Sequence, residues 1–262
     1  MDRRWCFLSS VVLVLVLVSS TSAILVARYE FEGTFDDTTG NGHDGTPIND
    51  ASIIGWLPEP QTGVLSVHKA QMQYVEIPDD PAWDSLSDSF TVSAWINADD
   101  NSDRLGLVTW EYNMTRAFSL RVDSEGANKV VRLQVTDGGG GRQNMPGTTH
   151  LDVGTWYFLA ATYQNIDAGT SEIKLYVNGA LDASHTVALG PMATPDVPLH
   201  IGAYIWDPAG YQKYMDGLMD DVRIYDTALS EEEIAAMFVP EPATIALLGL
   251  GGLAVFGGRK RR

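Results

Sequence analysis

The chain has 262 residues, a formal net charge of −17 at pH 7 and one cysteine, Cys6. Residues 1–23 carry a net charge of +1 and residues 239–262 a net charge of +3, so the segment between them carries −21. A segment this acidic repels nucleic acid and anionic membrane surfaces, which leaves neutral polymers, basic proteins and cations as partners. The alternative is that the acidity serves solubility alone. Residues 24–238 contain no cysteine, which excludes a disulfide there.

The first 23 residues have the order of a secretory signal peptide. Residues 1–4 are short and basic, residues 5–18 are apolar, and small residues follow up to Ala23. The apolar run is shorter than the roughly 20 residues that a membrane-spanning helix needs. We therefore predict cleavage by signal peptidase after Ala23, with an uncleaved anchor as the alternative.

The other end of the chain has the order of a sorting signal. The motif Pro240, Glu241 and Pro242 precedes an apolar, glycine-containing run at residues 243–258 and a basic cluster at residues 259–262. The run is short for a stable span, and the basic cluster marks the cytoplasmic side. This order closely resembles the PEP-CTERM signal of Gram-negative bacteria that make exopolysaccharide. The resemblance implies cleavage by an exosortase and display at the outer surface, with membrane contact only through the tail. A plain membrane anchor is the alternative.

Several stretches between the two ends alternate at period two, which is the pattern of half-buried strands. In residues 90–96 one face carries only apolar side chains, namely Phe90, Val92, Ala94 and Ile96. Residues 131–135 and 173–177 alternate in the same way, and Asn178 with Gly179 predicts a hairpin that returns along residues 180–187. The other strand candidates are residues 25–31, 105–110, 118–122, 157–163, 199–203 and 217–225. Many strands with short turns predict a β-sandwich or barrel.

One helix is predicted, directly before the sorting signal. Ser230 and Glu233 have the spacing of a capping box, in which each side chain bonds the other residue's backbone N–H. The apolar side of this helix carries Ile234, Met237 and Phe238. We expect that side to pack against the sandwich.

Four segments of the chain together resemble a known family. They are residues 35–45, residues 90–96, residues 156–163 with 175–179, and residues 215–225. Their order and spacing are similar to the laminin-G-like domains of the concanavalin A-like lectin/glucanase superfamily. The resemblance implies an all-β, two-sheet antiparallel jelly-roll sandwich over residues 24–238, with neighbouring first and last strands. One short C-terminal helix and a separate hydrophobic tail, residues 239–262, complete the expected organisation.

Oxygen-bearing side chains gather in two places. A glycine-rich turn holds Asp36, Asp37, Asn41 and Asp44, and a later cluster holds Asp216, Asp220 and Asp221. Calcium takes six to eight oxygen ligands of these kinds. The family resemblance implies that the two places adjoin and that one structural calcium is held by Asp37, Asn41, the carbonyl of His43, and Asp221. The alternative is an Asx-turn, in which these side chains bond their own backbone.

Aromatic residues form a second candidate site, because sugars lay their C–H faces on aromatic rings while polar groups take their hydroxyls. The candidate ligand-binding residues are Tyr204, Trp206 and Tyr211 in an expected loop, and Trp110 and Tyr112 in another. The alternative is that these aromatic side chains cap the core.

A hydrolase site is not indicated. Sugar hydrolases of the superfamily carry the order Glu-x-Asp-x-x-Glu, which this sequence lacks; Glu30 and Glu32 fall on the expected first strand, and Glu111 is isolated. The five histidines show no zinc-ligand spacing. We therefore expect a non-catalytic module that binds exopolysaccharide, another glycan or a surface protein. A matrix component without a discrete ligand and a divergent glycan hydrolase remain as alternatives.

Overall fold

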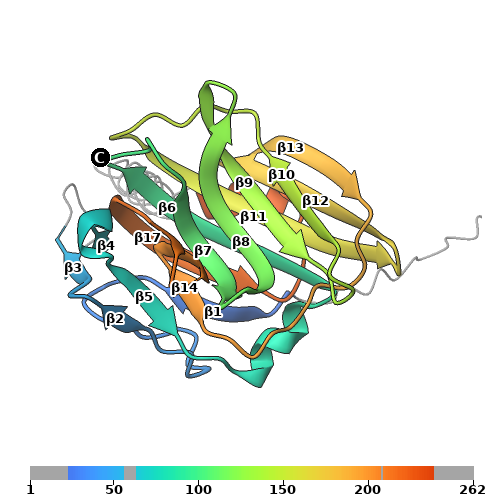
Figure 1. Ribbon diagram of the computed structural model, residues 1–262, viewed down its shortest axis with the longest axis horizontal. Helices are drawn as coiled ribbons and strands as arrows, with labels where there is room; N and C mark the ends of the chain where they lie inside the picture. Colours follow the sequence, from blue (N-terminus) through green and yellow to red (C-terminus); the bar gives the residue numbers. More distant parts are fainter. Residues whose placement is uncertain (1–22, 56–62, 208, 239–262) are drawn as a thin grey trace, which may run out of the picture.

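The computed structural model describes residues 23–55, 63–207 and 209–238. The predicted signal peptide and the sorting motif at Pro240, Glu241 and Pro242 lie outside the described residues, apart from Ala23. Within these ranges the chain forms two antiparallel sheets packed face to face (Figure 1), as the predicted jelly-roll sandwich requires. In the described part of the chain, no helix is long and apolar enough to cross a membrane.

One sheet has eight described strands. Its order is β13 (Ala180–Val187), β12 (Thr170–Val177), β11 (Trp156–Asp167), β6 (Ser89–Ala98), β17 (Gly217–Tyr225), β4 (Val64–Val67) and β3 (Ser52–Ile54), and β1 (Leu25–Tyr29) pairs with β17 beside this path. The pairing of β1 with β17 confirms that the first and last strands are neighbours.

The other sheet has seven described strands. Its order is β10 (Arg142–Pro146), β9 (Asn128–Thr136), β8 (Thr115–Glu125), β7 (Leu105–Tyr112), β14 (Leu199–Ile201), β5 (Tyr74–Ile77) and β2 (Thr46–Ile48). Two 3-10 helices, Lys69–Gln71 and Pro81–Leu86, lie in the connections before and after β5. A further hairpin consists of β15 (Ala203–Asp207) and β16 (Tyr211–Tyr214). We had predicted a loop at residues 204–214; its aromatic residues, which favour extended backbone, instead pair as strands.

The core lies between the two sheets and follows the alternation of the strands. The predicted inward side chains of β6, from Phe90 to Ile96, are all buried. Phe90 stacks on Phe118 of β8 in the opposite sheet, with ring centroids 4.8 Å apart. Because side chains alternate along a strand, every inward apolar residue leaves its neighbours on an outer face.

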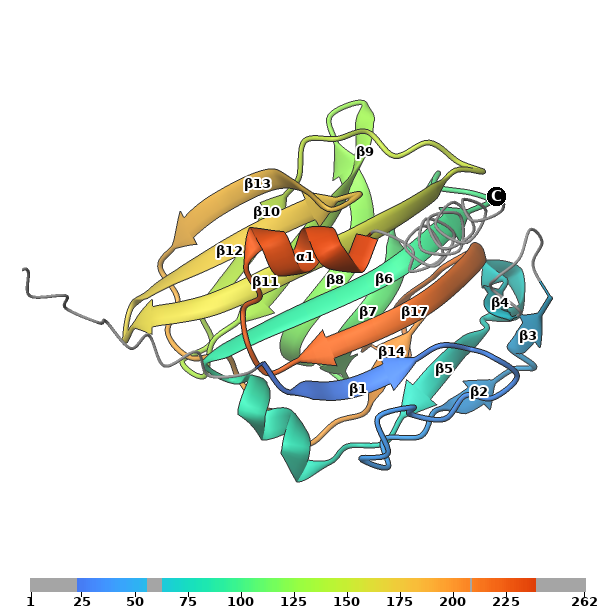
Figure 2. The ribbon, with the colours of Figure 1, turned by 180° about the vertical axis from the view of Figure 1, so that it is seen from behind.

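The outer face of the eight-stranded sheet is covered in part by α1 (Glu231–Phe238), which lies over β11 and its neighbours in Figure 2. The predicted capping box is present: the Ser230 N–H donates to Glu233 Oε2 at 2.8 Å, and the Glu233 N–H donates to Ser230 Oγ at 3.3 Å. Ile234 is buried with Phe158 on the sheet, and Phe238 stacks on Trp95 at 5.5 Å. The helix therefore buries an apolar patch in the middle of this face.

The capping box supplies the first prediction. We expect Ser230→Ala to lower the free energy of unfolding by about 1 kcal/mol, because the Glu233 N–H loses its acceptor. Ser230→Asp keeps an acceptor at the same position and should retain most of the stability. Equilibrium denaturation of the three proteins measures the difference. Equal unfolding free energies for Ser230→Ala and the unchanged chain would contradict a role for this cap.

Candidate functional site

The hairpin β15–β16 crosses the outer face of the seven-stranded sheet at Gly106 of β7. A Cβ atom on Gly106 would lie 2.3 Å from the backbone nitrogen of Tyr204, so any side chain there would collide with β15. The hairpin is also bonded to this sheet: Thr109 Oγ1 donates to the Ala203 carbonyl, and the Gly202 N–H donates to the Leu107 carbonyl, both at 2.8 Å. One hairpin is thus held above a sheet face that would otherwise be open.

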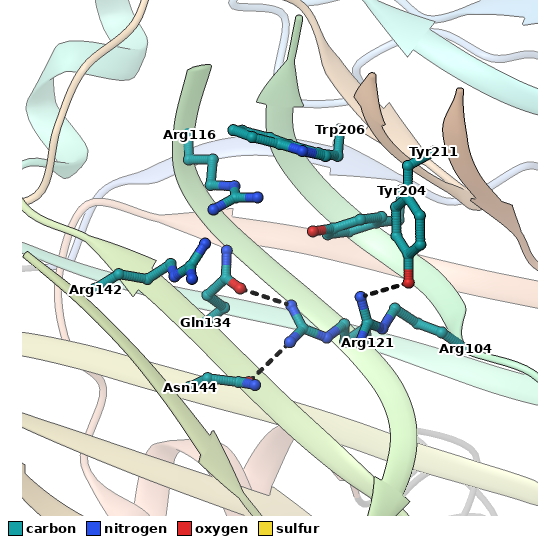
Figure 3. A pocket seen from close by; sticks show the side chains of 9 residues that line it. All are labelled: Arg104, Arg116, Arg121, Gln134, Arg142, Asn144, Tyr204, Trp206 and Tyr211. Atoms are coloured by element: carbon teal, nitrogen blue, oxygen red, sulfur yellow. Dashed lines mark hydrogen bonds between the residues drawn. The ribbon is translucent and has the colours of Figure 1, made fainter. Parts of the chain in front are cut away.

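A cavity of about 410 Å³ lies between this hairpin and the sheet (Figure 3). Its lining consists of Arg104, Arg116, Arg121, Gln134, Arg142, Asn144, Tyr204, Trp206 and Tyr211. We call this cavity the arginine pocket. The hairpin supplies the three aromatic rings of one wall, and β8, β9 and β10 supply most of the polar residues of the floor.

Strand register brings the floor residues onto one face. Gln134 of β9 lies opposite Ser119 of β8 and opposite Asn144 of β10. Arg121 is two residues beyond Ser119, so both point away from the core that buries Phe118 and Leu120. The polar floor is therefore the outer counterpart of the apolar inner face.

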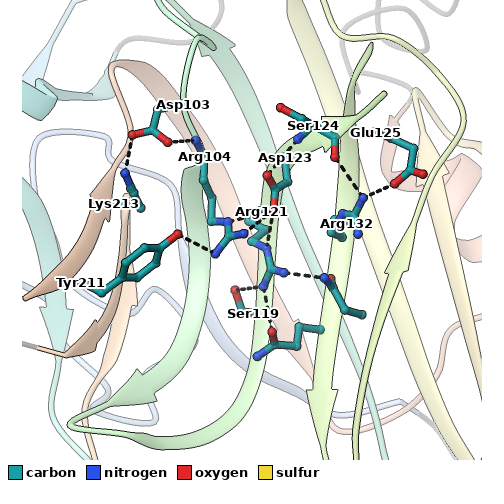
Figure 4. Close-up of polar contacts among 12 residues, drawn as sticks. Asp103, Arg104, Ser119, Arg121, Asp123, Ser124, Glu125, Arg132, Tyr211 and Lys213 are labelled. Carbon is teal, nitrogen blue, oxygen red and sulfur yellow. Dashed lines mark hydrogen bonds and ion pairs between the residues drawn. The ribbon is translucent and has the colours of Figure 1, made fainter. Parts of the chain in front are cut away.

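Arg121 is the most deeply placed of the four arginines, with 1% of its surface exposed. Its guanidinium donates to Asn144 Oδ1 at 2.8 Å, to Ser119 Oγ at 3.3 Å and to Gln134 Oε1 at 3.4 Å. Its Nε lies 3.5 Å from Asp123 Oδ2 (Figure 4). Burial and the nearby Arg104 lower the pKa of Arg121, although an arginine remains a cation in proteins. These contacts hold a fixed positive charge in the floor.

Arg104 and Arg116 are arranged against the aromatic wall. The guanidinium carbon of Arg116 lies 3.2 Å from the ring centroid of Trp206, in a cation–π arrangement. Arg104 donates to Asp123 Oδ2 at 2.8 Å and to the Tyr211 hydroxyl at 3.2 Å. In Figure 3 the guanidinium groups of Arg116, Arg121 and Arg142 gather around Gln134. Positive charge and aromatic surface thus share one cavity.

Two carboxyl groups adjoin this cavity without being among its lining residues. Asp123 would have a raised pKa from burial alone, but the Ser124 N–H and the Arg104 guanidinium hold the pKa below its ordinary value. Asp123 is therefore an anion that offsets part of the charge of Arg104 and Arg121.

Glu111 on β7 is the second of these carboxyl groups, and it is completely buried opposite Arg116. Its Oε1 accepts from Gln134 Nε2 at 2.7 Å, whereas Oε2 lies 3.6 Å from Arg116 Nε and accepts no hydrogen bond from the described residues. Burial raises the pKa of Glu111 to about 8, although Arg121 and Tyr204 act in the opposite direction. Burial thus favours the neutral form of this carboxyl, which then compensates little of the charge of Arg116.

Three of the five predicted glycan-binding aromatic residues come together in the arginine pocket: Tyr204, Trp206 and Tyr211. Trp110 does not belong to this group, and the prediction that it binds the ligand was wrong. It is 1% exposed, lies in the core and donates its Nε1–H to the Val197 carbonyl, because alternation along β7 turns Glu111 outward and Trp110 inward. Tyr112 is half-buried against His200, at 5.9 Å between rings, and does not line the pocket.

The sequence did not predict that four arginines would line one pocket. Four of the chain's 17 lysines and arginines line this one cavity, although the net charge of −17 suggested that anions would be repelled. The available signal was the alternation itself: Arg121 and Gln134 occupy outward positions of strongly alternating strands. Net charge averages over the whole surface and hides such a local concentration.

The predicted calcium residues do adjoin one another, as the resemblance implied. Arg28 connects the two acidic clusters: its N–H donates to Asp37 Oδ1 at 3.0 Å, and its Nε donates to Asp221 Oδ1 at 2.8 Å. Arg223 also binds Asp221, at 2.6 Å. Burial would raise the pKa of Asp221, but Arg223 and Arg28 hold it below its ordinary value. The guanidinium groups of Arg28 and Arg223 therefore both contact the Asp221 carboxylate.

The other three predicted calcium residues also form hydrogen bonds within the protein. The carbonyl of His43 accepts from the Tyr29 hydroxyl at 2.7 Å, and Asn41 Nδ2 donates to the Val26 carbonyl at 2.9 Å. Asp37 Oδ1 accepts from the Thr39 N–H at 3.0 Å, as an Asx-turn requires. The described residues contain no group of three or more His, Cys, Asp or Glu arranged for a metal ion. Calcium stays a prediction of the resemblance.

Thermal unfolding in calcium and in chelator tests that prediction. A structural calcium predicts a higher unfolding temperature in calcium than in chelator, and Asp221→Asn should remove the difference. Equal unfolding temperatures in calcium and in chelator would show that the site is not structural.

The buried carboxyl of Glu111 predicts a pH dependence. The pKa is raised from 4.5 to about 8, so the folded protein holds this proton more tightly than the unfolded chain does. As pH rises from about 4.5 to about 8, the unfolded state loses its proton first and the stabilisation, on the order of a few kcal/mol, is lost. Glu111→Gln removes this dependence.

Denaturation at pH 5 to 8 measures the effect of Glu111. The difference in unfolding free energy between the unchanged chain and Glu111→Gln should shrink, or change sign, as the pH rises. Glu232→Gln, which removes an exposed carboxyl from α1, is the control for a change of net charge. A difference that stays constant across this range would mean that Glu111 is ionised in the folded protein.

Two family models match the chain. The model described as the concanavalin A-like lectin/glucanases superfamily matches residues 69–235, and the PEP-CTERM protein-sorting motif matches residues 238–262. The sorting motif implies an exported protein that an exosortase sorts to the cell surface. No curated protein matches this chain.

Solved structures share the fold at low sequence identity. Domain 4 of an extracellular arabinanase from Geobacillus stearothermophilus, in complex with arabinotriose, is 20% identical with a TM-score of 0.55, over 83% of this chain and 99% of that one. The binding domain of a paraclostridial mosquitocidal protein is 16% identical with a TM-score of 0.60, over 82% of this chain and 51% of that one. The receptor-binding domain of botulinum neurotoxin type G is 10% identical with a TM-score of 0.59, over 82% and 50% respectively.

This chain spans about half the length of the two toxin domains, and the likeness to all three structures establishes the fold alone. The superfamily includes glucanases as well as lectins, so membership does not by itself decide between binding and hydrolysis. The matched segment is more than half of the chain, and the protein belongs to the concanavalin A-like lectin/glucanase superfamily.

Proposed function

We propose that this protein is an exported, surface-displayed and non-catalytic glycan-binding module, and that the arginine pocket is its binding site. The observation that carries the proposal is the aromatic wall. Tyr204, Trp206 and Tyr211 present their rings to a cavity of about 410 Å³ that amide side chains also line. Rings of fixed orientation beside hydrogen-bonding groups are the surface on which a sugar packs.

The lining favours binding over hydrolysis. Glycoside hydrolysis uses a pair of carboxyl groups on either side of the scissile bond. The described residues that line the pocket include no carboxylate, and Glu111 is buried beneath them with its Oε1 bonded to Gln134. Domain 4 of the arabinanase, which shares this fold, is seen with a bound arabinose oligosaccharide, and this supports a glycan as the ligand class.

The sorting signal supports the proposed location. Because the PEP-CTERM signal resembles those of Gram-negative bacteria that make exopolysaccharide, we propose exopolysaccharide as the glycan, bound at the outer surface or in the extracellular matrix. A signal peptidase and an exosortase are the proposed processing partners, with the tail as a transient membrane anchor. A matrix or protein-interaction component without a discrete glycan remains the second candidate.

Substitution of the wall tests the proposal. We expect Trp206→Ala in the full-length protein to weaken polysaccharide binding about tenfold or more, because the pocket loses the largest ring of its aromatic wall and the ring against which Arg116 lies. Trp156→Ala, which removes a half-buried tryptophan from β11 in the other sheet, should leave binding unchanged. Binding is measured by affinity electrophoresis, and circular dichroism confirms folding.

Three results would contradict this proposal in different ways. Equal binding by Trp206→Ala and the unchanged protein would move the site away from the hairpin. An absence of binding to any polysaccharide would favour the matrix or protein-interaction role. Release of reducing sugar would identify a hydrolase.

A further inference from the structure

The arginine pocket concentrates positive charge in a strongly acidic protein. Arg104, Arg116, Arg121 and Arg142 line one cavity, while the chain as a whole carries −17. Four guanidinium groups in one cavity repel each other, and Arg121 has also lost nearly all its contact with water. Such an arrangement destabilises the empty protein unless anions compensate it.

The protein's own anions compensate only part of this charge. Asp123 pairs with Arg104 at 2.7 Å and lies 3.5 Å from Arg121. Arg116 has Glu111 Oε2 at 3.6 Å, but this oxygen accepts no hydrogen bond from the described residues and burial favours its neutral form. Within the described ranges, Arg142 forms no ion pair at all, and its side chain is exposed at the mouth of the cavity.

The polar atoms that hold the arginines also orient them. Asn144 Oδ1 and Gln134 Oε1 accept from Arg121, so these amides turn their oxygens toward the guanidinium. Trp206 covers one face of the Arg116 guanidinium and leaves its edge, which carries the N–H groups, for other acceptors. An arginine N–H edge matches the two oxygens of a carboxylate or sulfate group.

We propose that the arginine pocket recognises an acidic polysaccharide, with Arg116 and Arg142 binding a carboxylate or sulfate group of a sugar whose ring packs against the aromatic wall. This inference rests on the proposed glycan-binding function and names the class of glycan. The net charge of −17 repels a polyanion at a distance. Selectivity for acidic sugars therefore comes from short-range contacts inside the cavity.

The test uses the full-length protein and three polymers: polygalacturonate, dextran sulfate and neutral dextran. We expect saturable binding to polygalacturonate or dextran sulfate, and binding at least tenfold weaker to neutral dextran. Added salt should weaken the binding of the acidic polymers more than the binding of neutral dextran, because ions screen the contacts between guanidinium and acidic groups. Galacturonate and galactose form a matched pair of competitors that differ in one carboxylate, and galacturonate should compete better.

Substitutions locate the contact. Arg142→Gln and Arg116→Gln should each weaken binding of the acidic polymer about tenfold, because each removes a charge-assisted hydrogen bond. Arg132→Gln is the matched control: it removes the same charge from β9, where Arg132 pairs with Glu125 and does not line the pocket. Since Arg142 is exposed, its replacement leaves the packing of the domain intact.

The outcomes separate this inference from the function on which it rests. Preference for polygalacturonate identifies a carboxylate ligand and preference for dextran sulfate identifies a sulfate ligand; both support the inference. Neutral dextran binding as tightly as the acidic polymers overturns the inference but keeps the glycan-binding function. Acidic polymers that bind equally to Arg142→Gln, Arg116→Gln and the unchanged protein also overturn it. No binding to any of the three polymers overturns both.

Discussion

The packing of two sheets against each other is the constraint from which the rest of this structure follows. Each strand must turn its apolar residues inward, as Phe90 and Phe118 do where they stack between the sheets. Because side chains alternate, the same strands must present their intervening residues on two outer faces. The segments that cover those outer faces therefore decide where a binding pocket can form.

The two outer faces are covered differently. On the eight-stranded sheet, α1 lies over Phe158 and Trp95 with its own Ile234 and Phe238, and an apolar layer results. On the seven-stranded sheet, the hairpin β15–β16 approaches closely only where Gly106 leaves room for its backbone. Beside this contact, polar residues of β8, β9 and β10 remain uncovered and form the floor of the arginine pocket. The helix adds an apolar layer to one face, and the hairpin adds an aromatic wall over polar residues to the other.

Charge is distributed by the same logic. Where the first and last strands pair, Arg28 and Arg223 stand against Asp221, so positive and negative groups satisfy each other within the protein. In the arginine pocket the balance differs, because Ser124 and Arg104 hold the pKa of Asp123 below its ordinary value whereas burial raises the pKa of Glu111. The two sites illustrate that burial and the hydrogen bonds that a carboxyl receives, rather than the number of acidic residues, decide whether an arginine is compensated.

Local features of this chain were determined by the sequence alone. Three features depend on residues only a few positions apart and can therefore be read from the sequence. They are the alternation in β6, the turn at Asn178 and Gly179, and the capping box at Ser230 and Glu233. The family resemblance added the sheet arrangement and the neighbourhood of β1 and β17. The aromatic residues of the hairpin were recognised as a group because they lie within one short segment.

Only the tertiary structure decided which residues share the pocket. Arg104, Arg121, Arg142 and Trp206 come from segments that strand pairing and one close backbone approach bring together. Whether Trp110 or its neighbour Glu111 faced the core depended on the register of β7, which alternation alone leaves ambiguous when both neighbours are buried. The contact between Arg28 and Asp221, one of the residues predicted to hold calcium, likewise depends on a strand pair that the linear sequence does not display.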